Sequence, residues 1–87
     1  MNKLAKYKVC GEVNTSISGK LLFLLLMDIT DENNTVIIPQ RRISESLRIT
    51  KSTVSRNLHR LRDAGYVEIV TRYNDYGGRA PNKYVLK

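Results

Sequence analysis

The hydrophobic positions of the chain predict a helix from residue 19 to about residue 29. Apolar residues recur there at three- and four-residue intervals, the spacing of one helix face. Ser16 and Ser18 are both candidate N-caps, because a serine oxygen accepts hydrogen bonds from the first helical turn. The predicted core face of this helix consists of Leu22, Leu25, Leu26 and Ile29.

The opposite side of this helix is apolar too, whereas a surface helix is polar on its outer side. Leaving such side chains exposed forgoes about 1.5–3 kcal/mol for each large one, so we expect a covering partner. One candidate is the segment 1–17, predicted as a strand or packed arm that covers the helix with Leu4, Tyr7 and Val9. The other, which we favour, is a second subunit in a two-fold homodimer. The predicted interface consists of Leu21, Phe23, Leu24 and Met27.

The remainder of the chain alternates between short strand and helix patterns. Pro39 fits the opening of a helix, where its missing N–H is not needed. Thr50 is a predicted N-cap, and Gly65 fits the left-handed position that ends a helix. The predicted elements are a β-branched strand at 35–38, helices at 40–47 and 51–64, and a hairpin at 66–86 whose loop spans 74–81.

Composition limits the class of protein. The chain has 87 residues, enough for one compact domain. A single cysteine and a single histidine provide neither an internal disulfide nor a structural zinc site. The longest apolar run, residues 21–27, is far shorter than the ~20 residues of a membrane span, and the N-terminus lacks the apolar core of a signal peptide. We expect a cytoplasmic protein, associated with the nucleoid or a plasmid.

The sequence also argues against an enzyme. Gly19-Lys20 suggests a phosphate-binding loop, but Asn14 occupies the first glycine position and Leu21 replaces the magnesium-binding Ser or Thr. His59 is the strong general-base candidate, and nothing around it indicates a catalytic cleft. We expect no catalytic activity, no cofactor and no metal.

The net charge of +7 is concentrated in one segment. Residues 1–39 carry four basic and four acidic side chains, and residues 63–87 carry four and three. Residues 40–62 carry seven and one, for a net charge of +6. Such a concentration favours an anionic partner over a merely solvated face.

The two helices of this segment, with the short turn between them, fit a helix-turn-helix. On the second helix Val54, Leu58 and Leu61 form the core stripe, and Asn57 borders it as a packing or capping residue. Short hydroxyls and a forked Arg suit base edges in a major groove. The predicted major-groove residues are Ser52, Thr53, Ser55, Arg56, His59 and Arg60. The predicted phosphate contacts are Gln40, Arg41, Arg42, Arg48, Thr50 and Lys51.

The stretch 43–61, followed by Ala64-Gly65-Tyr66-Val67, resembles the winged helix-turn-helix of bacterial regulators of the MarR, ArsR and CRP types. The closing stretch 77–86 resembles their wing, and the likeness covers residues 19–87. It implies an α+β, mainly helical fold of three helices with a C-terminal β-hairpin wing. It also implies wing contacts to the minor groove, here by Arg72, Gly77, Gly78 and Arg79.

One residue departs from the family pattern. Arg48 occupies a position where glycine is usual, so the turn either holds a non-glycine residue in the left-handed conformation or adopts another geometry.

These observations predict a sequence-specific protein that binds double-stranded DNA, most simply a small dimeric transcriptional regulator. A plasmid or phage segregation adaptor, or a replication accessory protein, fits the same residues. A winged helix that binds protein or RNA is a third hypothesis, but it requires an apolar or mixed-charge recognition face.

Overall fold

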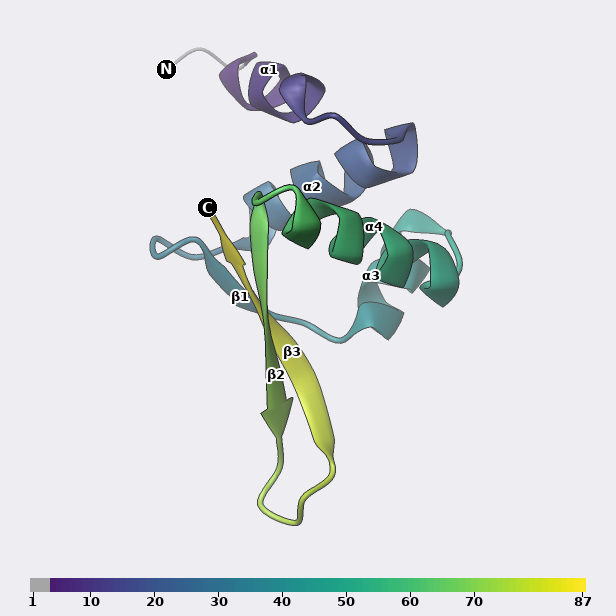
Figure 1. Ribbon diagram of the computed structural model, residues 1–87, viewed down its shortest axis with the longest axis vertical. Helices are drawn as coiled ribbons and strands as arrows, with labels where there is room; N and C mark the ends of the chain where they lie inside the picture. The colour runs from purple at the N-terminus through teal and green to yellow at the C-terminus, as the bar shows by residue number, and fades with distance from the viewer. Residues whose placement is uncertain (1–3) are drawn as a thin grey trace.

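The computed structural model describes residues 4–87, so residues 1–3 of the predicted N-terminal arm lie outside the described part. Figure 1 shows the helices gathered at one end and a long hairpin extending away from them. This architecture confirms the predicted fold class, a mainly helical α+β winged helix-turn-helix, but the described residues form four helices where three were predicted. The elements are α1 (Ala5–Glu12), α2 (Ile17–Ile29), β1 (Thr35–Ile37), α3 (Gln40–Leu47), α4 (Lys51–Asp63), β2 (Val67–Tyr73) and β3 (Arg79–Leu86).

The segment before α2 is not the strand that was one of its two predicted forms; it packs on α2, as the arm alternative has it, but as a helix. Residues 6–9 alternate between lysine and apolar side chains as a strand does, yet they belong to helix α1. This helix packs on α2 by burying Cys10 and Val13. The side chains that were expected to cover α2 stay at least half exposed, namely Leu4, Tyr7 and Val9.

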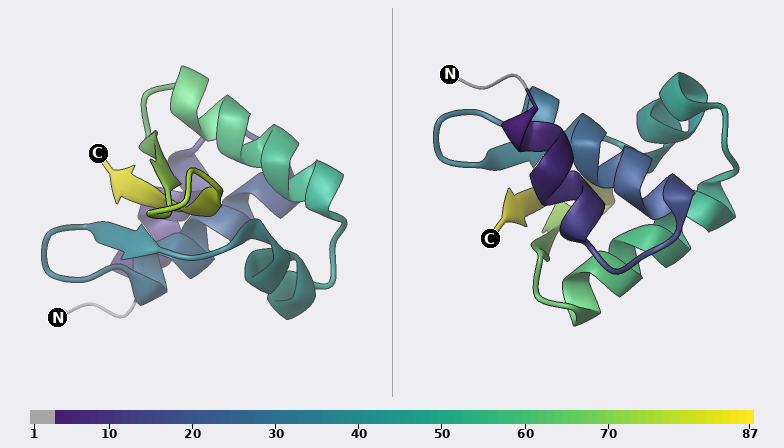
Figure 2. Two further views of the ribbon diagram at one scale, coloured as in Figure 1. Left: turned by 90° about the horizontal axis from the view of Figure 1, so that it is seen from below. Right: turned by 90° about the horizontal axis from the view of Figure 1, so that it is seen from above.

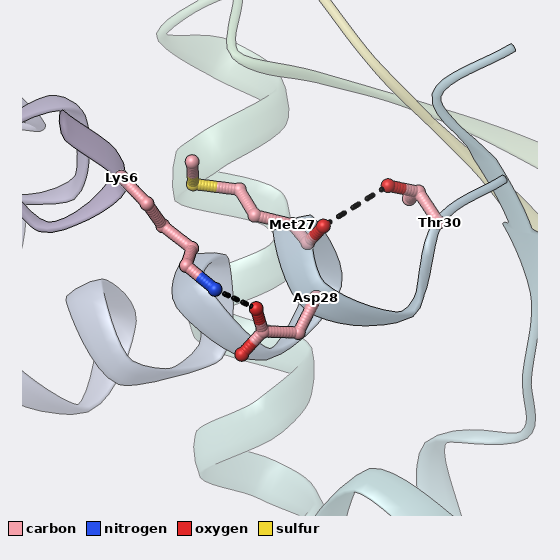
Figure 3. A network of polar contacts seen from close by, with 4 residues as sticks. All are labelled: Lys6, Met27, Asp28 and Thr30. Atoms are coloured by element: carbon pink, nitrogen blue, oxygen red, sulfur yellow. Dashed lines mark hydrogen bonds and ion pairs between the residues drawn. The ribbon is translucent and has the colours of Figure 1, made fainter. Parts of the chain in front are cut away.

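Polar contacts hold α1 against α2. Lys6 on α1 forms an ion pair with Asp28 near the end of α2, as Figure 3 shows. The Cys10 thiol donates to the Lys20 carbonyl over 2.8 Å, and the Lys20 ammonium donates to the Gly11 carbonyl over 2.9 Å. Burial raises the pKa of the Cys10 thiol. The thiol therefore keeps the proton that it donates to the Lys20 carbonyl at neutral pH.

The core face of helix α2 keeps Leu22 and Leu26 from the prediction but is rotated toward Phe23. The Ser16 hydroxyl accepts a hydrogen bond from the Gly19 N–H over 3.1 Å, which identifies Ser16 as the N-cap. Leu25 is partly buried and packs against the core, whereas Ile29 is 42% exposed and was wrongly assigned to it. The buried positions are Gly19, Leu22, Phe23 and Leu26, which again follow helical spacing.

Phe23 shows why the buried face of α2 differs from the predicted core face. Its side chain is 4% exposed, and its ring meets the ring of Tyr66 edge to face with centroids 5.8 Å apart. Tyr66 follows α4 directly, so the chain itself covers this side of α2. The chain itself therefore buries Phe23, which argues against its predicted place in a dimer interface. Met27 also packs against the core, whereas Leu21 is 44% exposed.

The turn between α3 and α4 adopts the left-handed alternative. Arg48 has φ 55° and ψ 43°, a conformation that costs a non-glycine residue about 1–2 kcal/mol. Hydrogen bonds fix it: the N–H groups of Arg48 and Ile49 both donate to the Ser44 carbonyl, and the Ser44 hydroxyl donates to the Ile49 carbonyl over 2.6 Å.

The sheet has three antiparallel strands in the order β1-β3-β2. The segment 35–38 was predicted as a strand, and β1 adds a third strand to the wing by pairing with β3. The pairing of β2 with β3 slips between Val70 and Arg72, because β3 carries one extra residue there. Pro81 lies in this irregular stretch and has no N–H for a ladder hydrogen bond.

Candidate nucleic-acid interface

Local signals fix both ends of α4. The Thr50 hydroxyl accepts a hydrogen bond from the Thr53 N–H over 3.1 Å, which caps the first turn. At the other end Gly65 has φ 86°, and the Tyr66 N–H donates to the Leu61 carbonyl over 2.9 Å. This is the left-handed ending that glycine favours.

Two faces of α4 have opposite character. Val54, Leu58 and Leu61 are at most 1% exposed and pack into the core. Thr53 and Ser55 are partly buried flanking residues, and the Thr53 hydroxyl lies 2.9 Å from the Thr50 hydroxyl, within the cap. The remaining predicted major-groove residues are exposed: Ser52, Arg56, His59 and Arg60.

Asn57 connects α4 to the start of α2. It is 2% exposed, and its amide NH₂ donates to the Thr53 carbonyl over 3.0 Å. Its amide oxygen accepts a hydrogen bond from the Ser16 hydroxyl over 3.1 Å. Because both halves of the amide are bonded, the residue is satisfied inside the protein and has a packing role.

Most cations of the segment 40–62 lack an acidic partner. Arg41 pairs with Glu45 at 3.8 Å, and Arg62 pairs with Asp63 at 3.1 Å. Within residues 4–87, five cations of the segment form no ion pair: Arg42, Arg48, Lys51, Arg56 and Arg60. Their charge therefore remains available to an anionic partner.

The wing tip is a closed turn. The Asn74 side-chain oxygen accepts hydrogen bonds from the N–H groups of Tyr76 and Gly78, each at 2.9 Å. Gly77 has φ 83°, and a Cβ on Gly78 would lie 2.9 Å from the Asn74 amide nitrogen. Both glycines are thus needed for the shape of the turn.

The two wing arginines differ in their surroundings. The Arg72 guanidinium donates to the Pro81 carbonyl over 3.2 Å and is partly buried against the hairpin. Arg79 is exposed at the start of β3. Of the two, Arg79 is the freer to contact a ligand.

A pocket lies between the start of α3 and the wing. Two of its residues, Asn82 and Tyr84, were missed by the sequence reasoning, because no local pattern marks a pocket created by a strand irregularity. Burial raises the pKa of the Tyr84 phenol, while the side chains of Asn82 and Gln40 and the charge of Arg79 act to lower it. The lining residues are Pro39, Gln40, Arg79, Ala80, Pro81, Asn82 and Tyr84.

The helices that carry the predicted DNA contacts, α3 and α4, lie on the opposite side of the molecule from α1. Seen from below, along the wing, α3 and α4 lie toward the viewer and α1 lies behind (Figure 2). From above, α1 is in front. Within residues 4–87 no group of three His, Cys, Asp or Glu residues is arranged to hold a metal ion. No helix of that part is long and apolar enough to cross a membrane.

Comparison with known proteins agrees with this geometry. The family model of the MarR family matches residues 23–75, from α2 to the wing loop, which is more than half of the chain. Searches of curated proteins and of solved structures returned no match. MarR proteins are winged-helix, DNA-binding transcriptional regulators rather than enzymes. By its family match and its winged helix-turn-helix, this chain belongs to the MarR family.

Proposed function

We propose that the protein is a dimeric, sequence-specific regulator that inserts α4 into the major groove of double-stranded DNA. The observation that carries this proposal is the set of five cations on α3, α4 and their turn that have no acidic partner in residues 4–87. The exposed face of α4 adds hydroxyl and guanidinium groups, which base edges accept. A partner that is uniformly negative and grooved satisfies both features.

The side chains divide into four roles. Arg56 lies at the centre of the exposed face and contacts guanine O6 and N7, assisted by Ser52, His59 and Arg60. Thr53 and Ser55, partly buried, contact the groove wall. Arg72 and Arg79 extend toward the adjacent minor groove. The phosphate contacts are Gln40, Arg41, Arg42, Arg48, Thr50 and Lys51.

The dimer contact that we propose uses the outer face of α2. Leu21 and Ile29 are 44% and 42% exposed. Together with Leu24, Leu25 and Leu47 they line an apolar groove, with Asp28 at its edge. The proposed interface therefore keeps Leu21 and Leu24 from the sequence prediction and replaces Phe23 and Met27. A two-fold dimer presents its recognition helices to half-sites about one DNA turn apart.

Sedimentation at micromolar concentration tests the dimer. We expect the mass of two chains for the natural protein and of one chain for Leu21→Glu, because a charge in an apolar interface is costly. Single chains of the natural protein at high micromolar concentration would contradict the dimer and leave the DNA contact intact.

Titration of labelled duplex DNA at several salt concentrations tests the DNA contact. Four phosphate-facing cations in each subunit (Arg41, Arg42, Arg48 and Lys51) predict a slope of about −7 for the dimer in a plot of log K against log salt. Selection from a random library then identifies the bound site. A single two-fold symmetric site supports a regulator, whereas tandem repeats support a segregation adaptor. An affinity that is unchanged by salt would overturn the proposal.

A further inference from the structure

The pocket between α3 and the wing has the properties of an anion site. Its lining comes from two places in the chain: Pro39 and Gln40 open α3, and residues 79–82 and Tyr84 belong to β3. The irregular pairing at Pro81 separates β3 from the regular ladder here. No carboxylate lines the pocket, whereas Arg79 contributes a positive charge.

The start of α3 supplies donors that have no partner. Ser16 and Thr50 cap α2 and α4 with their side chains, but the N-cap of α3 is Pro39, which has no side-chain oxygen. Within residues 4–87 no hydrogen bond involves the N–H groups of Gln40 or Arg41. Free N–H groups at a helix N-terminus, together with the helix dipole, favour an anion.

The pocket also holds polar atoms that have lost water without gaining a partner. Tyr84 is 0% exposed, and its hydroxyl lies near the side chains of Asn82 and Gln40 without forming a well-aligned hydrogen bond to either. The side-chain oxygen of Asn82 is buried and unpartnered as well. Such groups carry a desolvation cost that a ligand can relieve. A half-turn of the Asn82 amide replaces its oxygen by an NH₂ donor.

We propose that this pocket binds one phosphate group of the DNA backbone, held by the start of α3, Arg79, Asn82 and the Tyr84 hydroxyl. The inference rests on the proposed function, adds Asn82 and Tyr84 to the interface, and assigns Arg79 to a backbone phosphate in place of the minor groove. Because the donors come from both α3 and β3, the bound phosphate joins the wing to the helix-turn-helix. The same donors accept free inorganic phosphate, so the experiment distinguishes the two sources.

Tyr84→Phe removes the hydroxyl and keeps the ring that packs in the core. The hydroxyl forms no well-aligned hydrogen bond in the unbound protein, so the melting temperature should change little. We expect the Kd for the selected duplex to rise about tenfold at constant salt, the effect of losing one hydrogen bond to a charged group. Tyr7→Phe, which removes an exposed hydroxyl on α1, is the matched control and should bind as the natural protein does.

A scan of duplexes that each carry one neutral methylphosphonate locates the contact. At one position per half-site, the methylphosphonate should weaken binding by the natural protein about tenfold more than it weakens binding by Tyr84→Phe. Unchanged affinity of Tyr84→Phe, or equal methylphosphonate losses in both proteins, would overturn the phosphate site while leaving DNA binding in place.

Nuclear magnetic resonance of the whole chain tests whether free inorganic phosphate binds the pocket. Sodium phosphate is titrated against sodium chloride at equal ionic strength, and the Gln40 N–H and Asn82 side-chain signals are followed. If the natural protein binds no duplex, the proposed function and the backbone contact both fail. Saturable, phosphate-specific shifts in that case would assign the pocket to a free anion, and their absence would refute any anion site.

Discussion

Lys6 and Arg56 are both cations on helices, but the molecule uses them in opposite ways. Lys6 on α1 pairs with Asp28 on α2, and this hydrogen bond raises the pKa of its ammonium group. Lys20, in the same half, donates to a backbone carbonyl of α1. The near-neutral first 39 residues thus use their charges to hold two helices together.

Arg56 belongs to the half that forms the proposed interface. It has no ion pair within residues 4–87, and four further cations of the segment 40–62 share that condition. Both halves bury similar leucine stripes, so apolar packing does not distinguish them. What distinguishes them is whether each charge is used inside the fold or remains available outside it.

The largest expected effect tests the claim that the α2 half is held by packing. Leu26 is 0% exposed, so Leu26→Ala should lower the free energy of unfolding by about 2–5 kcal/mol. Ile17→Ala on the same helix, at an 86% exposed position, should change it by about 0.5 kcal/mol or less. Urea denaturation measures both, and equal losses would show that the buried face of α2 is misassigned.

The next effect tests whether the free cations of α4 differ from the paired ones. Arg56→Ala should weaken binding of the selected site by about 1–3 kcal/mol and relax discrimination at one base position. Arg62→Ala removes the same charge from the same helix, but Arg62 pairs with Asp63, so its effect should be small and uniform across sequences. Competition binding with site variants measures the difference. A uniform loss for Arg56→Ala would make it a phosphate contact.

The junction of the two halves gives a smaller effect. Asn57→Ala removes the buried link from α4 to Ser16 and should lower the free energy of unfolding by about 1–2 kcal/mol. Ser16→Ala should cost about 1 kcal/mol through the lost cap. If the Ser16–Asn57 hydrogen bond couples the halves, the double variant costs less than the sum of the single variants. Strict additivity in thermal or urea unfolding would argue against the link.

The smallest effect concerns Arg48 in the turn between α3 and α4, where the free energy of unfolding and the DNA affinity should change in opposite directions. Arg48→Gly relieves the left-handed strain and should raise the free energy of unfolding by up to about 1 kcal/mol. It should also weaken DNA binding, because one phosphate-facing charge is lost. Arg48→Lys keeps both charge and strain, so neither quantity should change much. A stability loss in Arg48→Gly would mean that the side chain itself holds the turn.

Local chemistry made the helix-turn-helix predictable. Thr50 caps α4 and Gly65 ends it because those interactions involve residues within one or two turns of the chain. The outward face of α4 followed from the spacing of its buried residues. Even the Arg48 conformation was one of the two alternatives that the sequence posed. The DNA contacts themselves remain proposals.

Tertiary partners decided the rest. The strand-like alternation of residues 6–9 gave way to helix α1, because Cys10 and Val13 found α2 to pack on. Phe23 became core because Tyr66, more than forty residues later, covers it. The pocket around Tyr84 exists because α3 meets an irregular stretch of β3. Spacing along a chain encodes which residues share a face, but which face is buried depends on distant residues that no local pattern specifies.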